Sequence, residues 1–240
     1  DEKVSFTLRE LGLSEARDLK VGSPLNKFIS GGQRKRLNIA LELIREPYIL
    51  FVDEPTSGLS STDSETVMEL LKEQAMKGKL IMVNIHQPSS GRFKMFDHLL
   101  VMDMGGYPVY SGNPVEGIIY FKKLVERVDA AESECEFCGN TNPEEILQVI
   151  ESRDIDEFGE FSDKRKMSPV EWYNMYEENI QSRQDFSLEQ SEIPGHMFRI
   201  PRHLKQFLIF FRRNLLSKLA DTQFLAISLL VAPILAVILG

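Results

Sequence analysis

The sequence has little that would support a disulfide-stabilised scaffold or a nucleic-acid-binding surface. Its 240 residues include 2 cysteines, which excludes a small secreted domain held together by disulfides. Positive charge is not in excess, since 28 Lys and Arg accompany 36 Asp and Glu, and the net charge of −8 argues against a nucleic-acid partner. Wholesale disorder is excluded as well, because 42% of the residues are hydrophobic and can form a core.

Charge is unevenly distributed along the chain, and long apolar runs are absent until its end. Residues 1–125 have a net charge of 0, residues 126–192 of −13 and residues 193–240 of +5. The chain begins with Asp1 and polar residues, so no signal peptide is visible. These differences predict three parts: a neutral body, an acidic middle and a basic tail that becomes apolar.

The apolar end predicts a membrane helix. Residues 224–240 contain no charged side chain, and this length is near the lower limit for crossing a bilayer; a buried core helix is the alternative. Basic residues precede the run, which predicts that the upstream chain is cytoplasmic. Residues 201–219 are amphipathic and predict a helix that either lies in the headgroup layer or packs against protein.

Alternating apolar and helical patterns predict an α/β fold with a mainly parallel sheet. The predicted helices cover residues 5–22, 32–46, 61–76, 114–128, 143–151 and 169–181. The predicted strands, of which the first two read as buried, cover residues 48–52, 80–85, 99–102 and 107–110. Ligands of such sheets bind beyond the carboxyl ends of the strands, where Asp53, Glu54 and His86 fall.

A glycine-rich segment, Ser30-Gly31-Gly32-Gln33, directly precedes the predicted helix 32–46. Two glycines let the backbone approach a ligand, and the N–H groups at a helix start favour an anion such as phosphate. An ordinary loop is the alternative for so short a segment.

Three polar residues follow the first two predicted strands. Asp53 and Glu54 are adjacent at the end of a predicted strand, so their side chains should point to opposite faces and have different roles. One would support a metal through water, and the other would polarise an attacking water. His86 is suited to a hydrogen bond with a terminal phosphate. Taken singly, each of these residues also has a purely structural explanation. The two acids would cap the turn at Pro55, and His86 would be an ordinary structural residue.

In combination, these motifs carry a family resemblance. The run ISGGQRKRLNIALELIREPYILFVDEPTSGLSSTDS and the continuation IMVNIHQPSS closely resemble the nucleotide-binding domain of ATP-binding-cassette (ABC) transporters, above all the G (White-type) subfamily. The segment VYSGNPVEGIIYF and the basic helix that leads into an apolar run are similar to that subfamily too. The resemblance implies a P-loop NTPase fold with a helical subdomain, and ATP and Mg²⁺ as cofactors.

The resemblance also implies a role for each matching residue. Ser30, Gly31, Gly32 and Gln33 match the signature motif, which contacts the γ-phosphate of ATP held by a second ABC subunit. Asp53 would support Mg²⁺ through water, Glu54 would be the catalytic glutamate and His86 the switch histidine. The D-loop, which runs along the dimer interface, is matched by Ser57, Gly58, Leu59 and Ser60, although the family usually has Asp at the last of these positions.

One departure from the family is an absence: no G-x-x-x-x-G-K-[ST] phosphate loop occurs in the sequence. We therefore expect a piece of a longer transporter that is inactive alone, because phosphoryl transfer needs that loop. A non-catalytic module that donates its signature motif in trans is an alternative. A soluble ABC ATPase acting on nucleic acid is another, disfavoured by the apolar end.

The predicted organisation has four parts. Residues 1–125 form the back of the nucleotide-binding domain, with a helical subdomain to about residue 46 and the core part from about residue 47. Residues 126–195 are an acidic helical insertion, 196–221 an amphipathic connecting helix and 222–240 a first membrane span. Cys135 and Cys138 in the insertion read as a reduced pair in a loop or, less readily, as half of a zinc site completed elsewhere.

Overall fold

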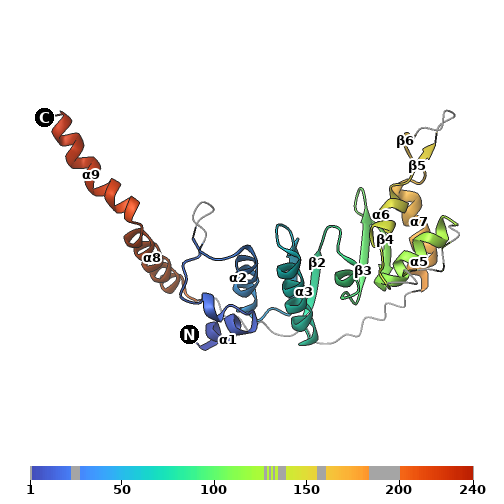
Figure 1. The fold of residues 1–240 in the computed structure, drawn as a ribbon, viewed down its shortest axis with the longest axis horizontal. Helices are drawn as coiled ribbons and strands as arrows, with labels where there is room; N and C mark the ends of the chain where they lie inside the picture. Colours follow the sequence, from blue (N-terminus) through green and yellow to red (C-terminus); the bar gives the residue numbers. More distant parts are fainter. Residues whose placement is uncertain are drawn as a thin grey trace. The chain divides into compact units, whose positions relative to one another are not determined.

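A computed structural model describes residues 2–22, 28–126, 129, 131, 133–134, 139–155, 161–183 and 201–239. The described part mixes helices and strands, as predicted, and divides into two units, Asp1–Glu192 and Ile193–Gly240 (Figure 1). The helices are α1 (Glu2–Glu10), α2 (Gly31–Leu43), α3 (Ser61–Met76), α4 (Ser90–Phe93), α5 (Pro114–Leu124), α6 (Glu144–Ile150), α7 (Pro169–Asn179), α8 (His203–Ala220) and α9 (Thr222–Leu239), with short 3-10 turns at Ser14–Ala16 and Gln181–Arg183. The strands are β1 (Ile49–Asp53), β2 (Leu80–Asn84), β3 (Leu99–Asp103), β4 (Tyr107–Gly112), β5 (Arg153–Ile155) and β6 (Phe161–Arg165).

The first helix ends earlier than the predicted span 5–22. Gly12 adopts a φ of 62°, and its N–H donates to the carbonyl of Arg9, while the N–H of Leu13 donates to the carbonyl of Leu8. This pair of hydrogen bonds is a Schellman motif, which stops a helix at a glycine in the left-handed region. The prediction of one long helix was wrong because Gly12 ends it.

Strands β1 and β2 pair in parallel, in a register that places Asp53 opposite Asn84. One face of the pair packs on α2 and α3, with Leu50 buried at 7% exposure. The other face is open, and Phe51 is 73% exposed. The prediction that both strands are buried was therefore wrong for one face of the pair, because the described helices cover only the other face. The core on the covered side consists of Leu11, Leu13, Ile39, Ala40, Leu43, Leu50, Val67, Met68 and Leu71.

The described residues do not form a mainly parallel sheet. They form three separate two-stranded sheets, of which one is parallel and two are antiparallel. Strands β3 and β4 are antiparallel because a tight turn joins them. Gly105 and Gly106 both have positive φ, 86° and 81°, as a short hairpin requires.

The acidic middle is not purely helical and contributes to a second hydrophobic core. It contains the antiparallel pair β5–β6, which the sequence reading did not predict. The buried Trp172 of α7 packs edge-on against Phe121 of α5, with 5.6 Å between the ring centroids. Residues on both sides of the predicted boundary between residues 125 and 126 thus share one core. That core consists of Phe93, Val109, Tyr110, Ile118, Phe121, Ile146, Val149, Ile150 and Trp172.

An ion-pair cluster accompanies this core, and in it Lys122 pairs with two carboxylates of the acidic middle. Lys122 is 5% exposed, and its Nζ lies 2.9 Å from Asp129 and 2.9 Å from Glu145. Burial alone would lower the pKa of Lys122, but hydrogen bonds to Glu145 and Asp129 outweigh it and raise the pKa above the usual value. A buried ammonium group is tolerated here because carboxylates of the acidic middle compensate its charge.

The second unit consists of α8 and α9, which meet at an angle of 78°. The carboxylate of Asp221 accepts hydrogen bonds from the N–H groups of Gln223 and Phe224, both at 3.1 Å, and so caps the start of α9. Among the described residues no single helix has the length and apolarity to cross a membrane; the bent pair His203–Ala220 and Thr222–Ile238 meets those criteria together. The predicted span 222–240 stays a prediction.

Candidate functional site

One pocket of about 300 Å³ lies at the carboxyl ends of β1 and β2. It brings together Glu54 and His86, two of the residues that the sequence singled out, with Ser57 and Leu59 of the predicted D-loop segment. Its lining consists of Glu54, Thr56, Ser57, Leu59, Ser61, Ser64, His86, Gln87 and Arg92. The walls therefore combine one carboxylate, one imidazole, one guanidinium and several hydroxyl groups, a set suited to a polar, anionic ligand.

Asn84 at the end of β2 organises the end of β1. Its side-chain amide donates a hydrogen bond of 2.8 Å to the carboxylate of Asp53, and its carbonyl accepts one of 2.8 Å from the N–H of Glu54. Glu54 has a φ of 42°, a conformation that costs a residue with a Cβ about 1 kcal/mol or more and that is concentrated at functional sites. The hydrogen bond to Asn84 holds this backbone in place and thereby fixes where the Glu54 side chain begins.

The segment after β2 supplies the other side of the pocket. His86 is exposed, and the next residue, Gln87, again has a positive φ of 46°. Arg92 reaches the same pocket from α4, and its Nε donates to the hydroxyl of Ser89 at 2.9 Å. Arg92 thus lines the same pocket as the two predicted catalytic groups.

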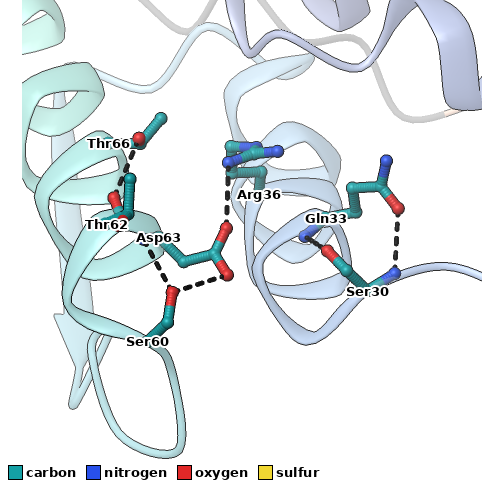
Figure 2. Close-up of polar contacts among 7 residues, drawn as sticks. All are labelled: Ser30, Gln33, Arg36, Ser60, Thr62, Asp63 and Thr66. Carbon is teal, nitrogen blue, oxygen red and sulfur yellow. Dashed lines mark hydrogen bonds and ion pairs between the residues drawn. The ribbon is translucent and has the colours of Figure 1, made fainter.

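The predicted signature segment forms the start of α2 through a capping box. Gln33 N–H donates to the Ser30 hydroxyl at 3.1 Å, and Ser30 N–H donates to the Gln33 side-chain oxygen at 2.8 Å (Figure 2). The first N–H groups of a helix have no acceptor within the helix, and the box does not use those of Gly31 and Gly32. Both groups therefore remain at a positively polarised helix end, as an anion site requires.

Residues 30–33 do not line the pocket that holds Glu54 and His86. They lie instead beside the start of α3: the position of a Cβ on Gly31 is 3.5 Å from the side chain of Leu59, and the Gly32 position meets the Asp63 carboxylate. Within one chain the structure thus separates the predicted signature segment from the predicted catalytic glutamate.

Sequence reasoning missed Asn84, Arg92 and Asp63. The patterns Ser-x-x-Gln at residue 30 and Ser-x-x-Asp at residue 60 are capping-box spacings, so both caps were visible in the sequence. No pattern indicated that Asn84 faces Asp53 or that Arg92 reaches the pocket, because both contacts depend on tertiary structure.

Metal-binding groups are scarce in the part of the chain that the structure describes, where no cluster of three or more His, Cys, Asp or Glu side chains could hold a metal ion. Cys135 and Cys138 lie outside the described residues. A single carboxylate such as that of Asp53 suits support of an ion through water, as predicted for Mg²⁺, rather than a closed protein cage.

The known proteins whose sequences are similar to this chain are ABC transporters. A family model described as "ABC transporter" matches residues 1–57. ABC transporter G family member 26 of Arabidopsis thaliana is 41% identical over 135 residues, which are 56% of this chain and 20% of the relative. The broad substrate specificity ATP-binding cassette transporter ABCG2 of Sus scrofa is 41% identical over 124 residues, 52% of this chain and 19% of the relative. The resemblance to ABC transporters of the G family is confirmed.

The chain spans about a fifth of the length of these ABC transporters. Their family model covers the predicted signature residues together with Asp53 and Glu54, whereas His86 lies beyond it. A solved structure of an ATP-binding cassette of an ABC transporter in its ADP conformation is also similar, with 27% identity and a TM-score of 0.45 over 52% of this chain and 48% of that one.

Proposed function

We propose that this chain belongs to the ATP-hydrolysing component of a membrane transporter, and that its pocket is the hydrolytic half of a composite ATP site. The observation that carries this proposal is the convergence of Glu54 and His86, from the ends of two parallel strands, on one hydroxyl-rich pocket. The similar proteins are ABC transporters, which supports transport as the purpose of the hydrolysis.

Each polar residue of the pocket has a distinct task in this proposal. The carboxylate of Glu54 accepts the proton of the attacking water, since its backbone is fixed at the edge of the pocket. His86 donates a hydrogen bond to the terminal phosphate and reports its loss. Asp53, oriented by Asn84, would hold Mg²⁺ through water, and the ion when bound would neutralise phosphate charge.

A second ABC subunit completes the site in this proposal. The Ser30–Gln33 segment lies outside the pocket, so its free N–H groups would serve the ATP of the partner, and the partner's equivalent segment would serve this one. The segment Ser57–Ser60 contributes both to the pocket wall and to the start of α3, which suits an interface loop between the two sites.

Membrane attachment is the remaining part of the proposal. Helix α8 carries basic residues, including Arg212 and Arg213, and α9 between Thr222 and Leu239 has none, a pattern that supports a cytoplasmic collar followed by an apolar segment in the bilayer. The pocket-bearing unit would then lie on the cytoplasmic side.

The experiment is a substitution in the complete protein. Glu54→Gln keeps the size of the side chain but removes the proton acceptor, so steady-state ATP turnover should fall by about 100-fold or more while ATP still binds, and the closed dimer should accumulate. Glu65→Gln on the exposed side of α3 is the matched control and should turn over ATP at the wild-type rate.

Near-wild-type turnover of the Glu54→Gln protein would overturn the proposal. It would also favour the second candidate, a non-catalytic module whose intact helix start at Ser30 serves only a partner's ATP. In that case Ser30 substitutions would still reduce turnover of the assembled pair.

A further inference from the structure

The carboxylate of Asp63 joins two helix starts that the proposed function assigns to different tasks. One oxygen, Oδ2, accepts a hydrogen bond of 3.1 Å from the Ser60 hydroxyl at the start of α3. The other, Oδ1, lies 3.8 Å from the guanidinium of Arg36, one turn into α2 (Figure 2). The same side chain therefore contacts the end of the predicted D-loop and the helix that begins with the predicted signature segment.

The environment of Arg36 makes this contact more than a solvated surface pair. Its side chain is 13% exposed, against 35% for Asp63, and its Nε is buried without a hydrogen-bond partner in the described structure. A largely buried guanidinium needs a nearby negative charge, because removing it from water is costly. Asp63 supplies that charge from the neighbouring helix.

Gly32 lets the two helix starts approach closely. A Cβ at this position would overlap Oδ1 of Asp63, lie 2.5 Å from its Cγ and lie 3.1 Å from its Cβ. The atoms concerned belong to a short side chain that is already held by Ser60 and Arg36, so it cannot easily move away. The second glycine of the signature segment is thus needed for helix packing as well as for ligand approach.

We propose that Asp63 is a positioning residue that locks the signature helix α2 to the D-loop, so that both move as one body when the composite site closes. The proposal rests on the proposed function of the site. It also gives a reason why Ser60 is tolerated at the end of the D-loop, where the related family usually has Asp. Asp63, one helical turn later, supplies the negative charge in its place.

The test is a double-mutant cycle in the complete, membrane-embedded protein, with ATP turnover as the readout. Arg36→Gln and Asp63→Asn should each lower kcat about two- to fivefold, the range expected for loss of a partly exposed ion pair, and change KM for ATP by less than about twofold. The double variant should be no slower than the slower single variant, because both changes remove one interaction. Arg36→Lys keeps the charge and should retain most of the turnover, whereas Glu65→Gln is the control on α3.

Two results would overturn the proposal that Asp63 couples α2 to the D-loop. The first is independent effects, in which the double variant loses the product of the two single factors. The second is an unchanged kcat in both single variants.

Glu54→Gln, assayed in the same preparation, separates this inference from the function on which it rests. If Glu54→Gln abolishes turnover while the Arg36 and Asp63 effects multiply, the lock alone is wrong. If Glu54→Gln is as active as the wild type, the proposed function fails and the lock, as a device of that function, fails with it.

Discussion

The N–H of Glu54 donates to the carbonyl of Asn84 at 2.8 Å, and the side-chain amide of the same asparagine donates to Asp53 at 2.8 Å. One residue of β2 therefore controls both carboxylates at the end of β1: through its backbone it fixes Glu54, and through its side chain it orients Asp53. These are separate interactions, so the second can be removed by substitution without removing the first.

Asn84→Val in the complete protein tests this division. Valine suits a strand and keeps the carbonyl that holds Glu54, but Asp53 loses its hydrogen bond. We expect the Mg²⁺ concentration for half-maximal ATP turnover to rise about three- to tenfold, the range for loss of a hydrogen bond to a charged group that is partly hydrated. Asn38→Ala, on the exposed surface of α2, is the control. An unchanged Mg²⁺ dependence would show that Asp53 needs no orienting partner.

The cap at Ser30 can be tested separately from the chemistry of the pocket. Ser30→Ala removes the hydroxyl that accepts from Gln33 N–H, and loss of such a cap costs about 1 kcal/mol of local helix stability. Amide hydrogen exchange in the first turn of α2 should therefore become about fivefold faster, and ATP turnover of the complete protein should fall. Ser30→Thr keeps a capping hydroxyl and should retain both properties. Equal exchange in the alanine variant and the wild type would contradict the role of the cap.

Local sequence signals predicted those elements whose ends carry strong markers. The range of α3, residues 61–76, was predicted as observed, because Ser60 caps its start and Gly78 follows its end. Strands β1 and β2 were placed to within one residue by their apolar runs. Both predicted catalytic residues reached one pocket because the carboxyl ends of parallel strands lie at one edge.

The features that escaped prediction depend on contacts between distant residues. The sequence could not show that Asp63 fills the space beside Gly32, or that Trp172 covers Phe121, since both are tertiary relationships. Composition was a poor guide to residues 126–192: they were predicted as an acidic helical insertion on account of their negative charge, yet apolar residues of α6 and α7 contribute to a core. Net charge describes the surface of a segment and says little about its buried face.

Trp172→Ala tests whether the acidic middle is part of that core. The side chain is 1% exposed, and truncating a buried tryptophan costs about 3–5 kcal/mol through lost burial and the cavity left behind. We expect a lower melting temperature of the purified complete protein and faster proteolysis between residues 93 and 179. Asn174→Ala, on the exposed side of the same helix, should change neither. A wild-type melting temperature for Trp172→Ala would mean that this segment contributes nothing to the fold.

Alkaline pH tests the same core through Tyr110. Burial first, and then the negative charge of Glu116 and the neighbouring Tyr120, raise the pKa of Tyr110 from 10.0 to about 12. The folded state therefore keeps this phenol neutral at a pH where the unfolded chain ionises it. The contribution of neutral Tyr110 to the free energy of unfolding is fully present below pH 10 and is lost as the pH rises from 10 to about 12.

Tyr110→Phe removes this titration together with the hydrogen bond of 2.7 Å from the hydroxyl to the Asn113 carbonyl. At pH 8 the variant should be less stable than the wild type by about 1 kcal/mol, the usual net value of such a bond. Between pH 10 and 12 the wild type should lose about 2–3 kcal/mol that the variant does not lose, so the order of the two melting temperatures should reverse. Absorbance at about 295 nm, where tyrosinate absorbs, should show one late-ionising tyrosine fewer in the variant. A constant difference across this range would mean that Tyr110 ionises in the folded protein as easily as in water, and that burial in the second core does not control its protonation.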